Sequence, residues 1–191
     1  VVGRNRSNVE FLYEEIFETA EYCHAGVTVP KTGCVVDVGS HIGMFSIYAK
    51  RMSPAVKIIA VEPMPELRRM YAANSALHGL DATLVPYGIG AESTTDTFTY
   101  YPEMSVLSGR GTDSRVQHEI LESFIHHEFE AESRDLGDSY VDQLIADRLE
   151  FEQVDVTIRT LSQIIREYGI DHIDLLKIDV EGSELDALRG I

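Results

Sequence analysis

Basic residues are scarce in this chain of 191 residues, and their scarcity excludes one class of partner. Sixteen lysines and arginines stand against 32 aspartates and glutamates, which gives a formal net charge of -16. A surface of this sign repels a phosphate backbone and gains nothing from counterion release. We therefore expect no nucleic acid among the partners of this protein.

Cysteines and long apolar runs are also scarce. The two cysteines, Cys23 and Cys34, are too few for a disulfide framework, and Cys34 opens an apolar stretch in which a free thiol packs as a small hydrophobe. No signal-peptide pattern and no run of about eighteen apolar residues is present. We expect a reducing, cytoplasmic location and no membrane association.

The hydrophobic residues that are present predict one α/β domain. They make up 44% of the chain. With 191 residues, the chain is long enough for one domain with a sizeable core and too short for two ordinary domains. Apolar runs typical of buried strands alternate with helical periodicity, which indicates an open, mainly parallel sheet flanked by helices. The predicted strands cover 34–38, 57–61, 82–87, 154–159 and 173–180, and the predicted helices cover 8–21, 44–52, 65–78 and 161–168.

Four parts are expected within this domain. Residues 1–33 form an N-terminal helical lid, and residues 34–87 form the half that binds the cofactor. Residues 88–153 form an insertion or second lid, with a loop at 101–109. Residues 154–191 return to the sheet. Two further helices are predicted inside the insertion, over 115–134 and 139–151.

A glycine-containing turn follows the first strand. Asp37 precedes Gly39-Ser40-His41-Ile42-Gly43, and the two glycines let the backbone approach a ligand while Asp37 orders the turn. A dinucleotide site usually has three glycines, as G-x-G-x-x-G, and the third is missing here. The turn therefore favours S-adenosylmethionine, which has no phosphate, over nicotinamide or flavin. A nicotinamide-dependent reductase remains the alternative enzyme.

Glu62 ends the second strand about twenty residues after the turn, where a ribose is expected to lie. An ionised carboxylate can accept hydrogen bonds from both ribose hydroxyls, and such bonds are stronger than neutral ones. The alternative is a solvated acid at a strand end. The expected cofactor-binding residues are Asp37, Gly39, Ser40, His41, Gly43, Glu62, Pro63 and Asp179.

Two more acids, Asp179 and Glu181, follow the last predicted strand. Because ligands of open α/β sheets bind at the carboxyl ends of the strands, we expect these acids to share a crevice with Asp37 and Glu62. Three residues are candidates for a general base. Glu181 is the first choice, Asp179 is expected to orient the cofactor, and His41 has a suitable ordinary pKa of about 6.5 but is more typical of a packed turn residue.

No metal site is expected. His118, His126 and His127 lie on a predicted helix, but the sequence has no HExxH motif or similar pairing of histidines with acids.

Two long motifs resemble those of a known family. Residues 36–45, with the turn described above, and residues 175–185, Leu-Leu-Lys-Ile-Asp-Val-Glu-Gly-Ser-Glu-Leu, are similar to the signatures of FkbM-type S-adenosylmethionine-dependent methyltransferases. The segments 12–17 and 159–167 resemble the variety embedded in polyketide synthases and nonribosomal peptide synthetases. The resemblance implies a Rossmann-like class I methyltransferase fold with S-adenosyl-L-methionine as cofactor.

The resemblance also implies a substrate and partners. It suggests an O-methyltransferase for natural product biosynthesis, acting on a hydroxyl of an intermediate held by the phosphopantetheine arm of an acyl or peptidyl carrier protein, beside neighbouring megasynthase domains. A long, thin arm needs apolar and aromatic walls with polar tips. The expected substrate contacts are Tyr13, Tyr101, Met104, Ser105 and Ser108, with simple packing of the insertion as the alternative.

The resemblance raises a question at the C-terminus. The family's sheet normally has seven strands, whereas four of its parallel strands are counted here, and the next family strand commonly carries a Glu-x-His pair that could supply the base. We expect the C-terminal strands to be absent from this chain and the chain to be part of a longer polypeptide. A noncatalytic scaffold domain of a megasynthase is the second alternative, and the acceptor, the methylated atom and the oligomeric state stay open.

Overall fold

The computed structural model describes residues 1–110, 119, 145 and 147–191. The chain divides into two compact units. The first consists of Val1–Asp96 and Asp155–Ile191, and the second consists of Thr97–Val154. The helix predicted over 115–134 lies outside the described residues except at 119, and the one predicted over 139–151 lies outside them except at 145 and 147–151. His118, His126 and His127 also lie outside the described residues.

The first unit is built on a sheet of four parallel strands in the order β3-β2-β1-β8. Valine and isoleucine dominate the two central strands, as expected for a parallel sheet whose faces are both covered. The predicted parallel α/β sheet is confirmed. The strands are β1 (Gly33–Val38), β2 (Val56–Val61), β3 (Ala82–Val85) and β8 (Leu175–Ile178).

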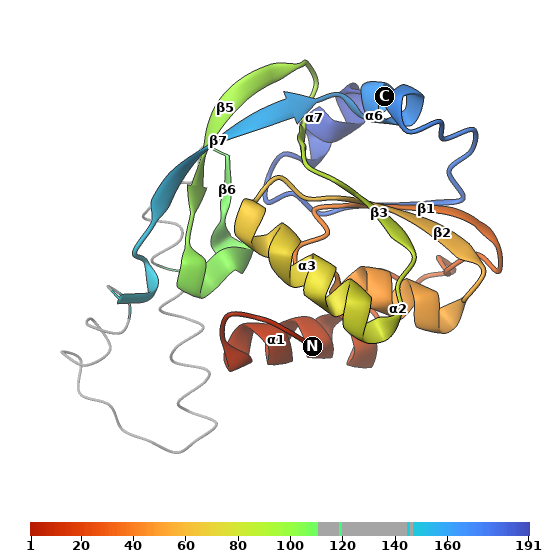
Figure 1. The fold of residues 1–191 in the computed structure, drawn as a ribbon, viewed down its shortest axis with the longest axis horizontal. Coiled ribbons are helices and arrows are strands. Elements are labelled where there is room, and N and C mark those ends of the chain that lie inside the picture. The colour runs from red at the N-terminus through yellow and green to blue at the C-terminus, as the bar shows by residue number, and fades with distance from the viewer. Residues whose placement is uncertain (111–118, 120–144, 146) are drawn as a thin grey trace. The chain divides into compact units, whose positions relative to one another are not determined.

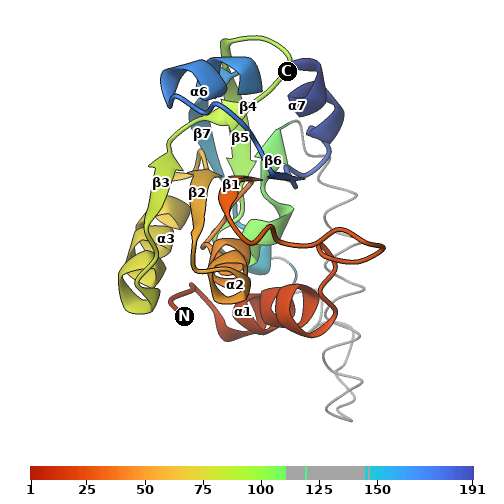
Figure 2. The same ribbon diagram turned by 90° about the vertical axis from the view of Figure 1, so that its right-hand side faces the viewer.

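Helices cover both faces of this sheet (Figures 1 and 2). Helices α2 (Met44–Met52) and α3 (Pro65–His78) lie on one face, and α6 (Leu161–Glu167) and α7 (Glu184–Arg189) lie on the other. Local sequence sets the ends of α3, because Pro65 occupies its first turn and Gly79 closes it with a φ of 63°. A capping box between Thr160 and Gln163 starts α6.

Alternation along β1 decides which side chains reach which face. Val36 and Val38 belong to a buried cluster with Leu161 and Ile164 of α6. Since successive side chains of a strand point to opposite faces, Asp37 faces the other layer, where α2 lies. A polar residue near the end of a central strand is thereby directed into the protein.

The N-terminal segment begins with α1 (Arg6–Tyr13), capped by the side chain of Asn5, and continues as the π-helical turn η1 (Glu14–Glu18). The predicted helix over 8–21 is wrong at its end, because Ala20 takes a left-handed conformation with a φ of 51° and the helix stops before it. The chain then turns back, which brings Tyr22 against Phe45 of α2, with ring centroids 5.5 Å apart.

Short strands complete both units. In the first, β4 (Gly88–Ile89) pairs in parallel with β7 (Glu152–Arg159), with Gly88 opposite Ile158. In the second, β5 (Thr94–Tyr100) pairs with β6 (Gly109–Arg110) in antiparallel fashion. The 3-10 helix η2 (Pro102–Leu107) lies between β5 and β6 in the sequence. The prediction of a loop over 101–109 is wrong there, because Pro102 starts helical turns at that point.

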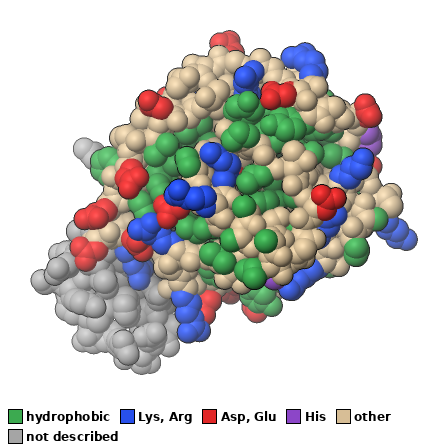
Figure 3. All heavy atoms as spheres, in the orientation of Figure 1, with side chains coloured by type: hydrophobic (Ala, Val, Ile, Leu, Met, Phe, Trp, Pro, Cys, Tyr) green, Lys and Arg blue, Asp and Glu red, His purple; other side chains and the backbone are tan. Residues whose placement is uncertain are grey.

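Charged and hydrophobic side chains are interspersed on the face shown in Figure 3. Among the described residues, no helix combines the length and the apolar character needed to cross a bilayer.

Candidate functional site

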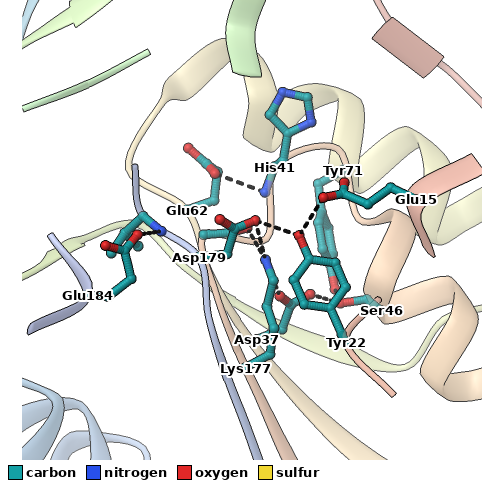
Figure 4. Close-up of polar contacts among 12 residues, drawn as sticks. Glu15, Tyr22, Asp37, His41, Ser46, Glu62, Tyr71, Lys177, Asp179 and Glu184 are labelled. Atoms are coloured by element: carbon teal, nitrogen blue, oxygen red, sulfur yellow. Dashed lines mark hydrogen bonds and ion pairs between the residues drawn. The ribbon is translucent and has the colours of Figure 1, made fainter. Parts of the chain in front are cut away.

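The carboxyl ends of three neighbouring strands, β2, β1 and β8, bring together the acids that the sequence singles out (Figure 4). Asp37 is the fifth residue of β1, Glu62 follows β2 directly, and Asp179 follows β8 directly. The three acids therefore lie at the same edge of the sheet, as the sequence predicts, but each has a different environment.

Both glycines of the turn after β1 have positive φ and close neighbours. Gly39 has a φ of 74°, and a Cβ at this position would lie 1.7 Å from the carbonyl oxygen of Asp179. Gly43 has a φ of 90°, and its Cβ would lie 2.8 Å from the ring of Tyr71. The glycines thus let the β8 loop and helix α3 pack directly on the turn.

Asp37 lies beneath the turn and is fully buried. Its Oδ2 accepts a 2.8 Å hydrogen bond from the hydroxyl of Ser46, which in turn accepts one of 3.0 Å from Tyr71. Its Oδ1 lies 3.4 Å from Nζ of Lys177, the residue opposite Asp37 in the parallel register. Asp37 therefore contacts other protein groups, and it orders the turn from below.

Lys177 is the common neighbour of the acids, and sequence reasoning missed it. Its buried ammonium group donates a 2.8 Å hydrogen bond to the carbonyl of Gly39 and lies 3.4 Å from carboxylate oxygens of both Asp37 and Asp179. The sequence does contain a signal for it, because Lys177 lies inside the apolar run Leu175–Ile178. A charged residue in a buried strand requires oppositely charged or hydrogen-bonding partners.

Glu62 is almost completely buried, with 4% of its surface exposed. Its Oε2 accepts a 2.9 Å hydrogen bond from the backbone amide of His41, and its Oε1 accepts one of 2.8 Å from Met64. Burial raises the pKa of Glu62 to about 7, although the two amides favour the ionised form. The next residue, Pro63, offers its carbonyl to the guanidinium of Arg68.

Ser40 and His41 occupy the middle of the turn. The hydroxyl of Ser40 is buried and has no hydrogen-bond partner among the described residues. His41 has a φ of 50°, and burial followed by the charge of Lys177 lowers its pKa to about 4. His41 is therefore neutral near pH 7 and a weak base there.

Asp179 faces the N-terminal segment. Its Oδ2 accepts a 2.8 Å hydrogen bond from the hydroxyl of Tyr22, a residue that the sequence did not single out. The Asp179 side chain is 42% exposed, so it is accessible as well as held in place.

Glu181 lies in an exposed turn with a φ of 49°. Partial desolvation, followed by the negative charges of Asp179, Glu184 and Glu15, raises the pKa of Glu181 to about 7. The Glu184 carboxylate orders this turn by accepting hydrogen bonds from the amides of Val180 and Gly182. Glu181 thus combines accessibility with a pKa near neutrality.

The predicted substrate contacts fall into both units. Tyr13 of the first unit is exposed and stacks on Phe17, with ring centroids 5.1 Å apart. The other four belong to the second unit, where the amide of Tyr101 donates a 2.9 Å hydrogen bond to the hydroxyl of Ser108. Tyr101, Met104 and Ser105 are buried, as packing of the insertion requires. Substrate binding by these residues stays a prediction.

A hollow in the first unit lies between α3 and β3. Its lining consists of small and apolar side chains with Tyr71 as the one ionisable group, so it offers no acid, base or nucleophile of ordinary strength. Within the described ranges, no three histidine, cysteine or acidic side chains gather as a metal site.

Comparison with known proteins identifies the family. A sequence profile described as the methyltransferase FkbM domain matches residues 37–190. The chain is 33% identical over its full length to part of the AMB antimetabolite synthetase AmbE of Pseudomonas aeruginosa, of which it spans 9%. It is 33% identical to the methyltransferase sdnD of Sordaria araneosa, with 98% of the chain and 70% of that protein covered.

A third relative is the 31-O-demethyl-FK506 methyltransferase FkbM of Streptomyces tacrolimicus, with 32% identity over 98% of the chain and 70% of that protein. These matches leave the nicotinamide-dependent reductase without support. The profile covers the turn after β1, the acid that follows β2 and the loop after β8, which are the parts that form the site. The chain belongs to the FkbM family of methyltransferase domains.

Proposed function

We propose that this chain is an S-adenosylmethionine-dependent O-methyltransferase domain that acts on a hydroxyl group of a carrier-tethered intermediate in natural product biosynthesis. The observation that carries the proposal is the contact between Glu62 and the turn after β1. The buried carboxylate of Glu62, directly after β2, accepts a hydrogen bond from the turn amide of His41, next to the buried Ser40 hydroxyl, which has no hydrogen-bond partner in the part of the chain that the structure describes.

The polar groups at this contact fit the cofactor. Each carboxylate oxygen of Glu62 uses one acceptor position on a backbone amide, which leaves a second position on each oxygen for a ribose hydroxyl. The buried Ser40 hydroxyl needs a partner, and a polar ligand group can provide it. We place the cofactor against Gly39–Gly43, Glu62 and Pro63, with the accessible carboxylate of Asp179 near its amino group. Asp37 contributes from below by fixing the turn.

When bound, S-adenosylmethionine supplies a methyl group on a positively charged sulfur, which departs as a neutral thioether. The protein has to align an acceptor oxygen and remove its proton, and alignment alone can provide roughly 7 to 11 kcal/mol. Glu181 is the proposed base, because its pKa of about 7 matches neutral operation whereas that of His41, about 4, does not. The hydroxyl proton passes to the Glu181 carboxylate as the oxygen takes the methyl group.

The relatives support the substrate class. The name of the Streptomyces tacrolimicus relative refers to an O-demethyl compound, which favours oxygen as the methylated atom. Similarity to a short part of a much longer synthetase supports a role beside other domains, including an acyl or peptidyl carrier protein. Cys23 and Cys34 are both unbridged, in keeping with a reducing compartment such as the cytoplasm.

Titration calorimetry tests the cofactor assignment. We expect S-adenosylmethionine to bind the wild-type protein and Glu62→Gln to weaken binding about 10- to 100-fold, because a hydrogen bond to a charged group contributes about 1.5–3 kcal/mol. Glu66→Gln is the matched control, since Glu66 lies on α3 and pairs with Arg4 at the surface. Absence of heat with the wild-type protein would refute the assignment.

A methyl-transfer assay with one further variant, Glu181→Gln, separates an enzyme from a noncatalytic scaffold. With a hydroxyacyl group on a carrier protein as substrate, mass spectrometry should detect the gain of one methyl group. Glu181→Gln should lower the rate at least about a hundredfold while leaving cofactor binding unchanged, because a general base contributes that much. Cofactor binding without methyl transfer to any hydroxyacyl substrate would favour the scaffold.

A further inference from the structure

Tyr22 contacts the site from a distant part of the chain. It lies in the turn after η1, 157 residues before Asp179 in the sequence, and its hydroxyl donates the 2.8 Å hydrogen bond to Oδ2 of that residue. The same hydroxyl lies 3.5 Å from Oε1 of Glu15. The proposed methyl-transfer chemistry makes no use of Tyr22, so this contact needs its own explanation.

The ring of Tyr22 is held as firmly as its hydroxyl. Nζ of Lys177 lies 5.1 Å from the ring centroid (Figure 4). The rings of Tyr22 and Phe45 of α2 form a T-shaped contact with an interplanar angle of 68°. Lys177 also pairs with Asp179, so the ring, the ammonium group and the carboxylate contact one another in a closed set. Such a set restricts the orientation of the Asp179 side chain.

We propose that Tyr22 is a positioning residue of the methyl-transfer site, which holds the Asp179 carboxylate beside Glu181 and so joins the N-terminal segment to the reacting end of the sheet. This inference rests on the proposed function for its consequence in catalysis. The action of Tyr22 on Glu181 through Asp179 requires neither cofactor nor substrate. Tyr22 is no base itself, because burial and the surrounding carboxylates raise the pKa of its phenol far above the ordinary value.

The effect on Glu181 follows from charge. Desolvation is the largest cause of the raised pKa of Glu181, and the negative charge of Asp179 is the next largest. A hydrogen bond from the Tyr22 hydroxyl partly offsets that negative charge. The other charged groups that face this pair stay in place when the hydroxyl is removed; they are Lys177 on β8, Asp37 on β1, Glu15 on η1 and Glu184 on α7.

Carbon-13 NMR of glutamate-labelled protein measures the effect without any ligand. The Glu181 carboxyl signal is assigned by its loss in Glu181→Gln, and its pKa is read from a pH titration. Tyr22→Phe keeps the ring and removes the hydroxyl, so we expect the pKa of Glu181 to rise by about half a unit. Tyr48→Phe is the matched control, since the Tyr48 hydroxyl bonds to Cys23 instead of an acid of the site, and it should cause no shift.

A double-mutant cycle separates positioning from packing. Asp179→Asn alone should lower the pKa of Glu181, and in that background Tyr22→Phe should cause no further change. An unchanged pKa in Tyr22→Phe, or the same shift with and without Asp179, would overturn the inference. The titration needs neither cofactor nor substrate, so its outcome is independent of the calorimetric test of the proposed function. In active enzyme, the acidic limb of the kcat/KM profile should move with the measured pKa.

Discussion

Replacing Lys177 with methionine is the sharpest test of how this site is built. Methionine keeps most of the volume of the side chain and removes its charge and its hydrogen bond to the Gly39 carbonyl. The carboxylate of Asp37 then keeps its bond from Ser46 but loses the only cation beside Oδ1 among the described residues. Since Asp37 is fully buried, water cannot replace the missing partner.

The expected cost follows from burial. Removing one partner of a buried ion pair costs about 3–5 kcal/mol, because an uncompensated charge is left behind. The pair with Asp179 adds little, since that side chain is 42% exposed and solvent screens it. The lost bond to the Gly39 carbonyl adds about 1 kcal/mol. We therefore expect Lys177→Met to lower the free energy of unfolding by about 5 kcal/mol.

Urea denaturation followed by circular dichroism and tyrosine fluorescence measures this loss, since the chain has nine tyrosines and no tryptophan. Coincidence of the two transitions tests whether the unfolding is two-state. Lys57→Met is the matched control, because Lys57 is an exposed lysine on the neighbouring strand β2, and it should change stability by less than about 0.5 kcal/mol.

A second substitution identifies the cause. In Lys177→Met, adding Asp37→Asn removes the buried charge, so the double variant should recover about half of the lost stability. A loss below about 1 kcal/mol in the single variant, or no recovery in the double variant, would show that the Asp37–Lys177 pair does not hold the turn in the way described.

Two further outcomes are expected from the geometry and charge of the turn. Gly39→Ala should cost several kcal/mol more than Gly79→Ala in thermal unfolding, because both residues have positive φ but an added Cβ meets Asp179 at the first position and open space at the second; equal costs would contradict the close packing. The pKa of Glu62 rises from 4.5 to about 7 on folding, so the folded state retains a proton that the unfolded chain releases, and stability should fall as pH rises between these values. At about 1.36 kcal/mol per unit this loss is roughly 3 kcal/mol, and denaturation of Glu62→Gln across the same pH range should lack it; an unaltered pH dependence would refute the assignment to Glu62.

Local sequence predicts the regular elements of the first unit well. Helices α2 and α3 begin and end where predicted, because glycine and proline restrict the backbone at their ends whatever lies around them. The N-terminal helix ends three residues earlier than predicted, at Glu18, where a left-handed Ala20 redirects the chain. That conformation is unusual for alanine, so composition and periodicity could not indicate it.

The sequence predicts where the acids of the site lie in the sheet. It does not predict which side chains surround each of them. A strand followed by an acid places Asp37, Glu62 and Asp179 at one edge of a parallel sheet. The contacts that distinguish them come from other elements: Ser46 binds Asp37, and Tyr22 binds Asp179. Sequence reasoning had no access to these contacts, because their partners come from elements that only folding brings together.

The amino-acid sequence by itself determined the parallel sheet, the turn after β1, the acids at the strand ends and membership of a methyltransferase family, because each depends on local patterns of apolar, glycine and acidic residues. Tertiary structure alone decided that Lys177 joins Asp37 to Asp179, that Glu62 is a buried acid with a pKa of about 7, and that Tyr22 reaches the site. These properties depend on burial and on contacts between distant segments, which come into being only when strands and helices pack together.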